Sequence, residues 1–579
     1  MSALNDLAPE DIQATFCAVL VEAWVQQGLT YAAVAPGSRS TPLTLALLND
    51  GRVQVDVFHD ERSAAFAALG FGISTGRAAL AVCTSGTAAA HFYAAVIEAD
   101  LSSIPLLVCT ADRPPELRDV GAPQTIDQVK LFGTAVRWFH DPGVPVLANA
   151  ASWTSLGTRS VAATAGLDPG PVHLNLPFRE PLVGQPLALS PTKAHTSVHV
   201  GKPILGATGI EELVDTMRQV AEPDGRGLII AGNGCGDPSV VNAFAKNLAW
   251  PVFADSRSGC QGQSQAVIHF DSLLRIKETA TSLAPRIVLR LGESPSSKVL
   301  NQWVTDSGAF EVHISNRPRV YDPAHQVAMH ITADPTDVLQ LVLDNGSTRM
   351  WSAPSSESWD QAWLRSDHAA RQCLAATQDH GPLTDGITAA RGVLCGLGSG
   401  SRLFLSSSMP IRDMEWFGGD CSRVTVHANR GANGIDGVIA SAVGVARGSG
   451  VPTTVLIGDV ALIHDSSTLA SLTTIDADVR IVVVDNNGGG IFHHLPQAST
   501  VEPALFEKVY GTPHSADLVQ VALAWGLPAE TVSTRQDLHK ALALRGPRLI
   551  RIATNRDSDV AAHKRAHAAI AEAVRTAQN

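Results

Sequence analysis

Short apolar runs recur along this chain and alternate with longer segments of helical periodicity. Within the first 190 residues the runs fall at Tyr31–Ala35, Val53–Phe58, Ala79–Cys83, Ile104–Cys109 and Pro171–Leu176. Helical patterns lie between them, near Asp11–Gln27, Arg62–Ser74 and Ala88–Glu98. Short strands that are apolar on both faces are typical of parallel sheets covered by helices on both sides. The pattern therefore predicts an α/β fold with doubly wound parallel sheets.

Two further stretches repeat this pattern. Their apolar runs are Gly227–Ile230, Val252–Ala254, Arg286–Leu291 and Phe310–Ile314, then Leu403–Leu405, Thr454–Ile457, Arg480–Val484 and Arg548–Ile552, before a helical pattern over Ser558–Gln578. Val183–Thr208 is rich in Pro, Lys, Ser and Gly, and Trp351–Gly381 turns polar and helical, so we place boundaries there. The 579 residues also exceed what one hydrophobic core serves. We predict three doubly wound domains, at residues 1–190, 205–365 and 380–579.

The charge and the cysteines exclude several classes of partner and compartment. A net charge of −12 argues against a nucleic-acid or anionic-membrane surface as the main partner. The acidic N-terminus has no apolar signal-peptide core, and the uncharged stretch Ala78–Ile97 is interrupted by Thr84-Ser85-Gly86-Thr87, which favours strand, turn and helix over a membrane span. Eight scattered cysteines without a Cys-x-x-Cys spacing indicate buried free thiols. We expect a cytoplasmic protein with no nucleic-acid partner and no stable membrane insertion.

Polar clusters follow two strands of the third stretch. Gly458-Asp459 comes directly after one apolar run, and Asp485-Asn486-Asn487-Gly488 follows the next, with a helical segment at Ser467–Ile475 between them. One strand–helix–strand crossover makes the two strands parallel neighbours, and ligands of open α/β sheets lie beyond the carboxyl ends of the strands. Mg²⁺ binds carboxylate, amide and carbonyl oxygens together with phosphate. Asp459, Asn486 and the carbonyl of Gly488 are therefore candidate metal ligands; the alternative is a plain crossover whose Asp and Asn cap helices.

This arrangement resembles the diphosphate–Mg²⁺ motif of thiamine diphosphate enzymes, although that motif often has Gly where this chain has Val460. A thiamine cofactor also needs a carboxylate on its pyrimidine ring nitrogen and an apolar residue between its two rings. Glu61, in His59-Asp60-Glu61-Arg62, is the candidate carboxylate, and its alternative role is to complement a helix dipole. Ile435 is the candidate wedge, and its alternative is an ordinary core position.

An ordered set of motifs resembles one family within that superfamily. The motifs are APGSRSTPLTLAL (35–47), HDERSAAFAALG (59–70), TSGTAAA (84–90), TADRPPELRDVGAPQTI (110–126), NRGANGIDG (429–437) and NNGGGIF (486–492). Together they are similar to the MenD family, the 2-succinyl-5-enolpyruvyl-6-hydroxy-3-cyclohexene-1-carboxylate synthases. The matches span the first and third stretches in family order, and the middle stretch matches chiefly at Ser296-Ser297-Lys298.

The resemblance implies a transferase of menaquinone biosynthesis that uses thiamine diphosphate and Mg²⁺, or Mn²⁺. It implies decarboxylation of 2-oxoglutarate and 1,4-addition of the succinyl carbanion equivalent to isochorismate. Both substrates carry two carboxylates, which arginine pairs with in two hydrogen bonds. The implied cofactor-side residues are Glu61, Ser408, Ile435, Asp459, Asn486, Gly488, Ile491 and Phe492. The implied substrate-side residues are Ser38, Arg39, Arg113, Gln124, Lys298, Arg412, Arg430, Ile491 and Phe492, of which Arg39, Arg113, Lys298, Arg412 and Arg430 join Glu61 as catalytic candidates.

The resemblance also implies a homodimer or homotetramer with the active site between subunits. Two departures concern the substrate side only: Pro123 replaces an Asn of some relatives, and Val299 replaces an Arg. Each arginine taken singly could instead form a surface ion pair. No catalytic role is assigned to His59, His493 or His494, which lie near these motifs.

Three other functions compete with this interpretation. An acetolactate synthase or another thiamine-dependent 2-oxoacid decarboxylase would share Glu61, Asp459 and Asn486 but needs no arginine-rich dicarboxylate site. A nucleotide-binding dehydrogenase is suggested by Gly232-Asn233-Gly234-Cys235-Gly236-Asp237 after an apolar run, yet Asp237 stands where the fingerprint requires its third glycine. A non-catalytic module with the same fold is disfavoured by the presence of all three site residues.

Overall fold

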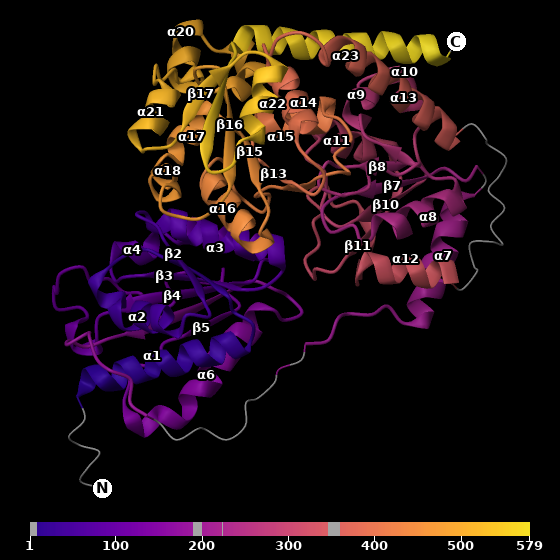
Figure 1. The fold of residues 1–579 in the computed structure, drawn as a ribbon. Helices are drawn as coiled ribbons and strands as arrows, with labels where there is room; N and C mark the ends of the chain where they lie inside the picture. The colour runs from indigo at the N-terminus through magenta and orange to yellow at the C-terminus, as the bar shows by residue number, and fades with distance from the viewer. Residues whose placement is uncertain (1–7, 189–197, 199, 223, 345–358, 579) are drawn as a thin grey trace.

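Three parallel sheets follow one another along the chain (Figure 1). The computed structural model describes residues 8–188, 198, 200–222, 224–344 and 359–578. Within these residues each sheet has six strands, and every pairing between named strands is parallel. The fold class predicted from the apolar runs is therefore confirmed.

The strands of the first sheet lie in the order β2-β1-β3-β4-β6-β5. Their bounds are β1 Tyr31–Val34, β2 Gln54–Val57, β3 Ala79–Cys83, β4 Leu106–Asp112, β5 Trp138–His140 and β6 Pro171–Pro177. The helices of this region are α1 Pro9–Gln26, η2 Ser38–Ser40, α2 Thr41–Asp50, α3 Glu61–Thr75, α4 Thr87–Ala90, α5 Tyr93–Leu101, η3 Pro115–Leu117, η4 Leu147–Asn149 and α6 Ala150–Thr164.

The second sheet has the order β12-β11-β10-β7-β8-β9. Its strands are β7 Gly227–Ala231, β8 Val252–Ala254, β9 Ala266–Val267, β10 Ile287–Leu291, β11 Phe310–Ser315 and β12 Val327–Thr332. The helices around it are α7 Ala207–Ala221, α8 Pro238–Leu248, α9 Phe270–Leu274, α10 Lys277–Ser282, α11 Lys298–Ser307, α12 Pro335–Asp344 and α13 Trp359–Gln378.

The third sheet has the order β14-β13-β15-β16-β18-β17. Its strands are β13 Arg402–Leu405, β14 Thr425–His427, β15 Thr453–Gly458, β16 Val479–Asp485, β17 Ala529–Val532 and β18 Arg548–Ala553. Its helices are α14 Gly386–Gly396, α15 Met409–Phe417, α16 Val438–Ser449, α17 Asp459–His464, α18 Ser467–Leu472, η5 Gly490–His494, α19 Gln497–Thr500, α20 Pro503–Phe506, η6 Glu507–Gly511, α21 Leu518–Ala524, α22 Arg535–Ala543 and α23 Arg556–Gln578.

In central strands of the first and third sheets, alternate residues enter different hydrophobic cores. In β3, Ala79 and Ala81 belong to one core and Leu80 and Val82 to another. In β15 and β16 the same alternation separates Val455, Ile457, Ile481 and Val483 from Leu456, Val482 and Val484. Strands that are buried on both faces explain why the apolar runs are continuous rather than alternating.

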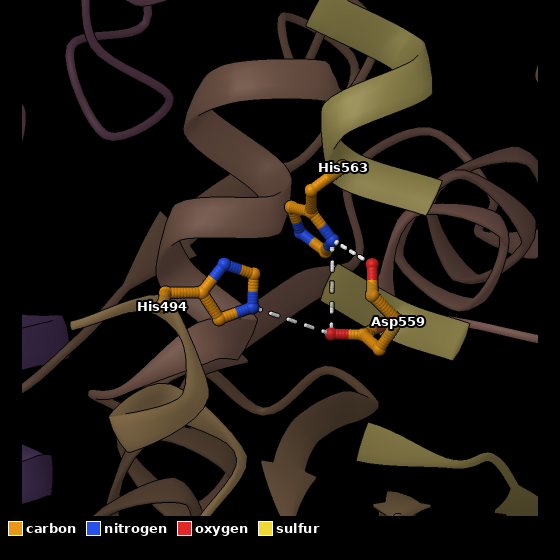
Figure 2. A group of neighbouring side chains, drawn as sticks. All are labelled: His494, Asp559 and His563. Carbon is orange, nitrogen blue, oxygen red and sulfur yellow. Dashed lines mark hydrogen bonds and ion pairs between the residues drawn. The ribbon is translucent and has the colours of Figure 1, made fainter. Parts of the chain in front are cut away.

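The C-terminal helix α23 joins the second and third regions. It packs along α13, and Ala566, Ile570 and Val574 enter a core shared with the second sheet. The first turns of α23 bring Asp559 and His563 beside His494 of η5, a segment that contributes to the candidate site (Figure 2). The end of the chain thus fixes the position of a loop that lies far from it in sequence.

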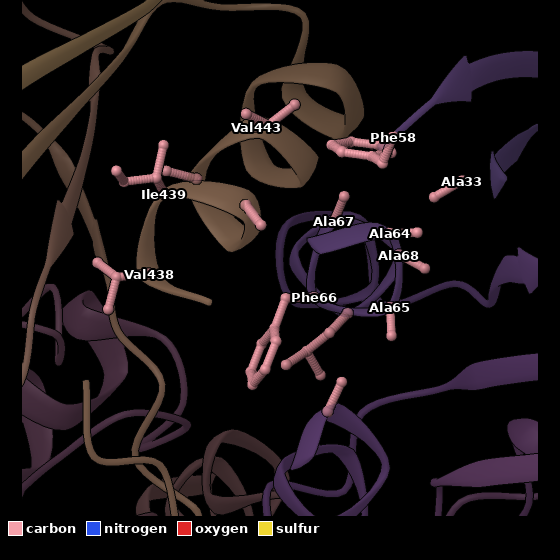
Figure 3. Close-up of a cluster of buried hydrophobic side chains, with 14 of the residues drawn as sticks. Ala33, Phe58, Ala64, Ala65, Phe66, Ala67, Ala68, Val438, Ile439 and Val443 are labelled. Carbon is pink, nitrogen blue, oxygen red and sulfur yellow. The ribbon is translucent and has the colours of Figure 1, made fainter. Parts of the chain in front are cut away.

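The first and third sheets share one hydrophobic core because α3 packs directly on α16 (Figure 3). The two helices approach backbone to backbone. A Cβ atom added at Gly70 would lie 1.9 Å from the carbonyl oxygen of Ser441, and one added at Gly444 would lie 1.9 Å from that of Ala67. Only glycine permits this approach. The contact sets the orientation of the first region relative to the third.

Five strands, each at a sheet edge, have no counterpart among the predicted apolar runs: β5, β9, β12, β14 and β17. The helix expected over Ala88–Glu98 is two helices, α4 and α5, interrupted at His91-Phe92. Parts of the two expected boundary segments, residues 189–197, 199 and 351–358, lie outside the described residues. Six cysteines are buried, whereas Cys373 is half-buried and Cys395 is exposed, so the expectation of burial is wrong for Cys395. Among the described helices, none has the length and apolar character needed to cross a bilayer.

Candidate active site

Asp459 lies where β15 meets α17, next to the carboxyl end of the neighbouring strand β16. Its side chain is almost fully buried. Oδ2 accepts hydrogen bonds from the backbone N–H groups of Asn486 (3.1 Å) and Gly488 (2.8 Å), and Oδ1 accepts one from Val460 (2.7 Å). The carboxylate thus ties together the two loops that the sequence singled out. Burial raises the pKa of Asp459, and a cation at this point would offset the cost of the buried charge.

The loop after β16 presents further oxygen ligands at the same place. The side-chain Oδ1 of Asn486 is buried and accepts no hydrogen bond within the described part of the chain. Gly488 adopts φ +138°, and a Cβ added there would lie 1.9 Å from the carbonyl oxygen of Gly511. A buried amide oxygen without a donor is costly unless a ligand binds it. The donor set therefore fits a hard divalent cation that also carries phosphate.

A histidine that was not predicted from the sequence lies next to Asp459. Nε2 of His514 lies 3.2 Å from Oδ2 of Asp459 and 3.8 Å from Oδ1 of Asp485. Asp485 is also bound by Arg551, at 2.6 Å. His514 lies in the loop between η6 and α21, and no spacing or motif in the sequence connects it to Asp459. Only the folded chain brings the two together.

Nine of the predicted residues line one cavity of about 400 Å³ at the carboxyl end of the third sheet: Ser408, Arg412, Arg430, Ile435, Asp459, Asn486, Gly488, Ile491 and Phe492. Ser408 precedes α15 in a backbone conformation that is unusual for a non-glycine residue, with φ +72°. Its carbonyl oxygen accepts a hydrogen bond from Nη1 of Arg412, at 2.5 Å. Backbone strain of this kind occurs often at ligand-binding sites.

Arg412 and Arg430 place two positive charges in this cavity. Neither forms an ion pair with any carboxylate of the described residues. Burial, followed by the nearby Arg257 and Arg412, lowers the pKa of Arg430. Partly buried guanidinium groups without a paired carboxylate favour an anionic ligand, and their planar fork suits a carboxylate.

Asp413 and Asp559 also line the cavity, although no motif in the sequence points to them. His563 bridges them: its Nε2 lies 2.6 Å from Oδ1 of Asp413, and its Nδ1 lies 3.7 Å from Oδ2 of Asp559. His494 approaches the same Oδ2 at 3.7 Å (Figure 2). Burial alone would lower the pKa of His563, but Asp413 and Asp559 raise it to about 9. A charged imidazolium at neutral pH therefore balances the two carboxylates.

The predicted residues of the first sheet form a separate group around Ser85. Arg113 donates a hydrogen bond to Oγ of Ser85, and Nε2 of Gln124 donates to its carbonyl oxygen at 3.1 Å. Arg39 is paired with Glu180 at 2.8 Å and donates to the carbonyl oxygen of Phe178. Burial and the charge of Arg39 lower the pKa of Arg113, so the two guanidinium groups lie close together. Because β1, β3 and β4 are neighbours, their carboxyl ends bring these side chains together.

The other predicted residues lie outside the cavity. Glu61 is the first residue of α3 and is near enough to Cys83 to contribute to the raised pKa of that thiol, after burial. Ser38 is exposed at the start of η2, and Lys298 is exposed at the start of α11. In a single chain, Glu61, Ser38, Arg39, Arg113, Gln124 and Lys298 do not line the cavity that holds the other nine.

Comparison with known proteins relates this geometry to one family. Family models of thiamine pyrophosphate enzymes match residues 14–131 (N-terminal TPP binding domain), 208–381 (middle domain) and 423–552 (C-terminal TPP binding domain). A protein of Thermobifida fusca named 2-succinyl-5-enolpyruvyl-6-hydroxy-3-cyclohexene-1-carboxylate synthase is 38% identical over 96% of this chain and 98% of its own length. Synthases with the same name from Chloroflexus aurantiacus (35% identical, 94% of each chain) and Rubrobacter xylanophilus (38%, 94% of this chain and 96% of theirs) also match along most of their length.

The chain belongs to this synthase family. Its cofactor is thiamine diphosphate, since both TPP-binding domains of the superfamily are present. The family assignment rejects the dehydrogenase hypothesis, because the Gly232–Asp237 segment lies within the middle domain of a thiamine pyrophosphate enzyme. Val460 does not separate the chain from the superfamily, since the C-terminal domain model covers that position.

Proposed function

We propose that this protein decarboxylates 2-oxoglutarate and adds the succinyl carbanion equivalent to isochorismate in a 1,4 fashion. The product would be 2-succinyl-5-enolpyruvyl-6-hydroxy-3-cyclohexene-1-carboxylate, formed with CO₂ in menaquinone biosynthesis. The observation that carries the proposal is that Arg412 and Arg430, without ion pairs among the described residues, share one cavity with Asp459 and Asn486. Two dicarboxylate substrates require such cations next to the cofactor.

Asp459, Asn486 and the carbonyl of Gly488 would hold Mg²⁺, or Mn²⁺ in its place. The support is the buried Oδ1 of Asn486, which accepts no hydrogen bond in the described structure, together with the buried carboxylate of Asp459. The cation would anchor the cofactor's diphosphate at the carboxyl ends of β15 and β16. His514 would lie beside the cation, because its Nε2 is 3.2 Å from Oδ2 of Asp459.

Bound thiamine diphosphate would supply the carbanion chemistry. The residues of the chain would orient the cofactor and hold its proton. Glu61 would hold a proton at the pyrimidine ring nitrogen, and Ile435 would separate the two rings. Arg412 and Arg430 would bind substrate carboxylates from the third sheet, with Ser408, Ile491 and Phe492 lining the same cavity. From the first sheet Ser38, Arg39, Arg113 and Gln124 would complete the substrate side, and Lys298 would contribute from the central domain.

A second copy of the chain would bring the two groups of residues together. Glu61 and the group around Ser85 lie outside the cavity of their own chain, although they are implied in the same reaction. We therefore propose a homodimer or homotetramer in which residues 1–190 bind the pyrimidine for one partner and residues 380–579 bind the diphosphate for another. Residues 205–365 would form the central domain.

Incubation of the purified protein with thiamine diphosphate and Mg²⁺ tests the proposal. Product would be followed by liquid chromatography and mass spectrometry in three reactions: 2-oxoglutarate with isochorismate, 2-oxoglutarate alone, and pyruvate alone. We expect the succinylated cyclohexene carboxylate only in the first. Turnover of pyruvate that does not depend on isochorismate would refute the proposal and favour an acetolactate synthase-like enzyme.

A further inference from the structure

Glu415 is a buried carboxyl group on the same helix as Arg412, one helical turn further on. Residues three apart on a helix are neighbours on its surface. Glu415 therefore lies beside the cavity without lining it. Its charge also acts on Arg430, where it opposes the lowering of the pKa caused by burial and by the two neighbouring arginines.

Glu415 holds a turn that belongs to the central domain. Its Oε2 accepts hydrogen bonds from the backbone N–H of Ser296 (3.0 Å) and from the hydroxyl of Ser296 (2.9 Å). The next residue, Ser297, donates to Oδ2 of Asp271 at 2.6 Å and caps α11 by accepting from the N–H of Leu300. Lys298 is the first residue of that helix. Both residues that precede Lys298 are thus fixed by buried carboxyl groups.

A role in stability alone is a poor explanation for this carboxyl group. Glu415 is 2% exposed, and its Oε1 has no hydrogen-bond partner within the described part of the chain. Burial, followed by the charge of Asp255, raises the pKa of Glu415 to about 8. An apolar side chain of similar volume would avoid this desolvation cost. The benefit of the carboxyl group is directional, because it accepts two hydrogen bonds from one residue of another domain.

We propose that Glu415 is a positioning residue that holds the Ser296–Lys298 turn in place relative to Arg412 and Arg430. The inference rests on the proposed function, in which Lys298 and the two arginines bind carboxylates of the substrates. Glu415 acts through Lys298 and does not touch the substrate itself.

Two variants separate the hydrogen bonds from the volume of the side chain. Glu415→Met keeps a similar volume but loses the acceptor, and should raise KM for one of the two substrates roughly ten-fold while kcat changes little. Glu415→Gln keeps an acceptor oxygen and resembles the protonated carboxyl, so it should stay within about two-fold of the wild type. Glu278→Ala removes an exposed glutamate of the central domain, the domain that carries Ser296 and Lys298, and is the control.

A double-mutant cycle with Lys298→Ala tests the proposed route. Substitutions that act through the same residue are non-additive. Glu415→Met should therefore have no further effect on KM in the Lys298→Ala background. Independent, multiplicative effects would overturn the proposal, and so would wild-type KM values for both substrates in Glu415→Met. If that variant fails to fold, Ser296→Ala, which leaves only the backbone donor, should show the same dependence on Lys298 with a smaller effect.

Amide hydrogen exchange over residues 294–300 gives a readout that does not depend on the substrate. Loss of the acceptor should accelerate exchange at Ser296 in Glu415→Met and leave it near wild type in Glu415→Gln. Unchanged exchange in Glu415→Met would refute the inference even if the protein used other substrates. If exchange at Ser296 is accelerated in Glu415→Met but the wild-type protein makes no succinylated product, the proposed function is refuted. The positioning of Ser296 by Glu415 is then still established.

Discussion

The first and third sheets have the same doubly wound construction, yet they present their predicted site residues differently. At the third sheet nine residues line one cavity, and two arginines in it have no carboxylate partner among the described residues. At the first sheet the residues gather around Ser85, and Arg39 already has a counter-ion in Glu180. The third-sheet residues share a cavity within one chain, whereas the first-sheet residues lie outside that cavity. This difference supports the proposal that a second copy of the chain contributes to the site.

The largest expected effect comes from the first sheet. Glu61→Gln should lower kcat by about 10²–10⁴-fold, as is typical for the loss of an essential acid–base group. It should leave binding of thiamine diphosphate and Mg²⁺ largely intact, because the anchoring residues lie on the third sheet. Steady-state kinetics and calorimetric titration with the cofactor check both expectations. Substantial remaining activity would contradict the role of Glu61.

Mixing two inactive variants tests whether the first-sheet and third-sheet residues of one active site come from different chains. Asp459→Asn should abolish metal-dependent cofactor binding, whereas Glu61→Gln should not. Unfolded and refolded together in equal amounts, the two should recover about a quarter of wild-type activity, since half of the dimers are mixed and each mixed dimer has one intact site. If both halves of a site came from the same chain, no activity would return.

The sequence predicts which site residues lie together when they are close along the chain. It does not predict contacts that depend on the packing of distant segments. Asp459 and Asn486 are one crossover apart, so local order along the chain places them together. Asp413 and His563, in contrast, are separated by 150 positions, and their 2.6 Å contact depends on how α23 packs across the third region. The edge strands are not predicted for a related reason. Strands such as β12 and β17 are partly exposed and lack continuous apolar runs. The hydrogen bonds between Glu415 and Ser296, which precedes Lys298, are a contact between domains. No periodicity in the sequence predicts a contact of this kind.

A smaller effect should come from replacing an arginine of the first sheet or of the third sheet by lysine. Arg412→Lys and Arg113→Lys keep the charge but lose the planar fork, so each should raise KM for one substrate roughly ten-fold. If the two substitutions affect different substrates, each half binds one carboxylate partner; if they affect the same substrate, the halves share it. Arg423→Lys, at an exposed position, is the control and should change neither KM.

The smallest effect concerns the pH dependence of stability at the third sheet. Four titratable groups face His563: Asp413 from α15, Asp559 and His567 from α23, and His494 from η5. Its pKa is raised to about 9 in the folded protein, above the ordinary 6.5. The resulting stabilisation, about 3 kcal/mol, should be present below pH 6.5 and be lost as pH rises through 9.

Denaturant unfolding between pH 6 and pH 10 measures this dependence. His563→Gln should remove the loss of stability in that interval while lowering stability at pH 6. An unchanged pH profile in the variant would show that another group is responsible. The first sheet offers a contrast, because burial lowers the pKa of His173 to about 3, so this residue stays neutral in the folded protein and should contribute no loss of stability as pH rises from 6 to 10.

The contact between α3 and α16 restricts how the protein can be redesigned. Gly70 and Gly444 leave no space for a side chain, so the backbone alone sets the angle between the two helices. Glu61 opens one of these helices, and the loop that carries Arg430 and Ile435 leads into the other. Mutant libraries aimed at new substrates can vary the substrate-side lining of the cavity while keeping Asp459, Asn486 and Gly488. They should leave the helix pair untouched, since no neighbouring substitution can restore an alignment that depends on the absence of side chains.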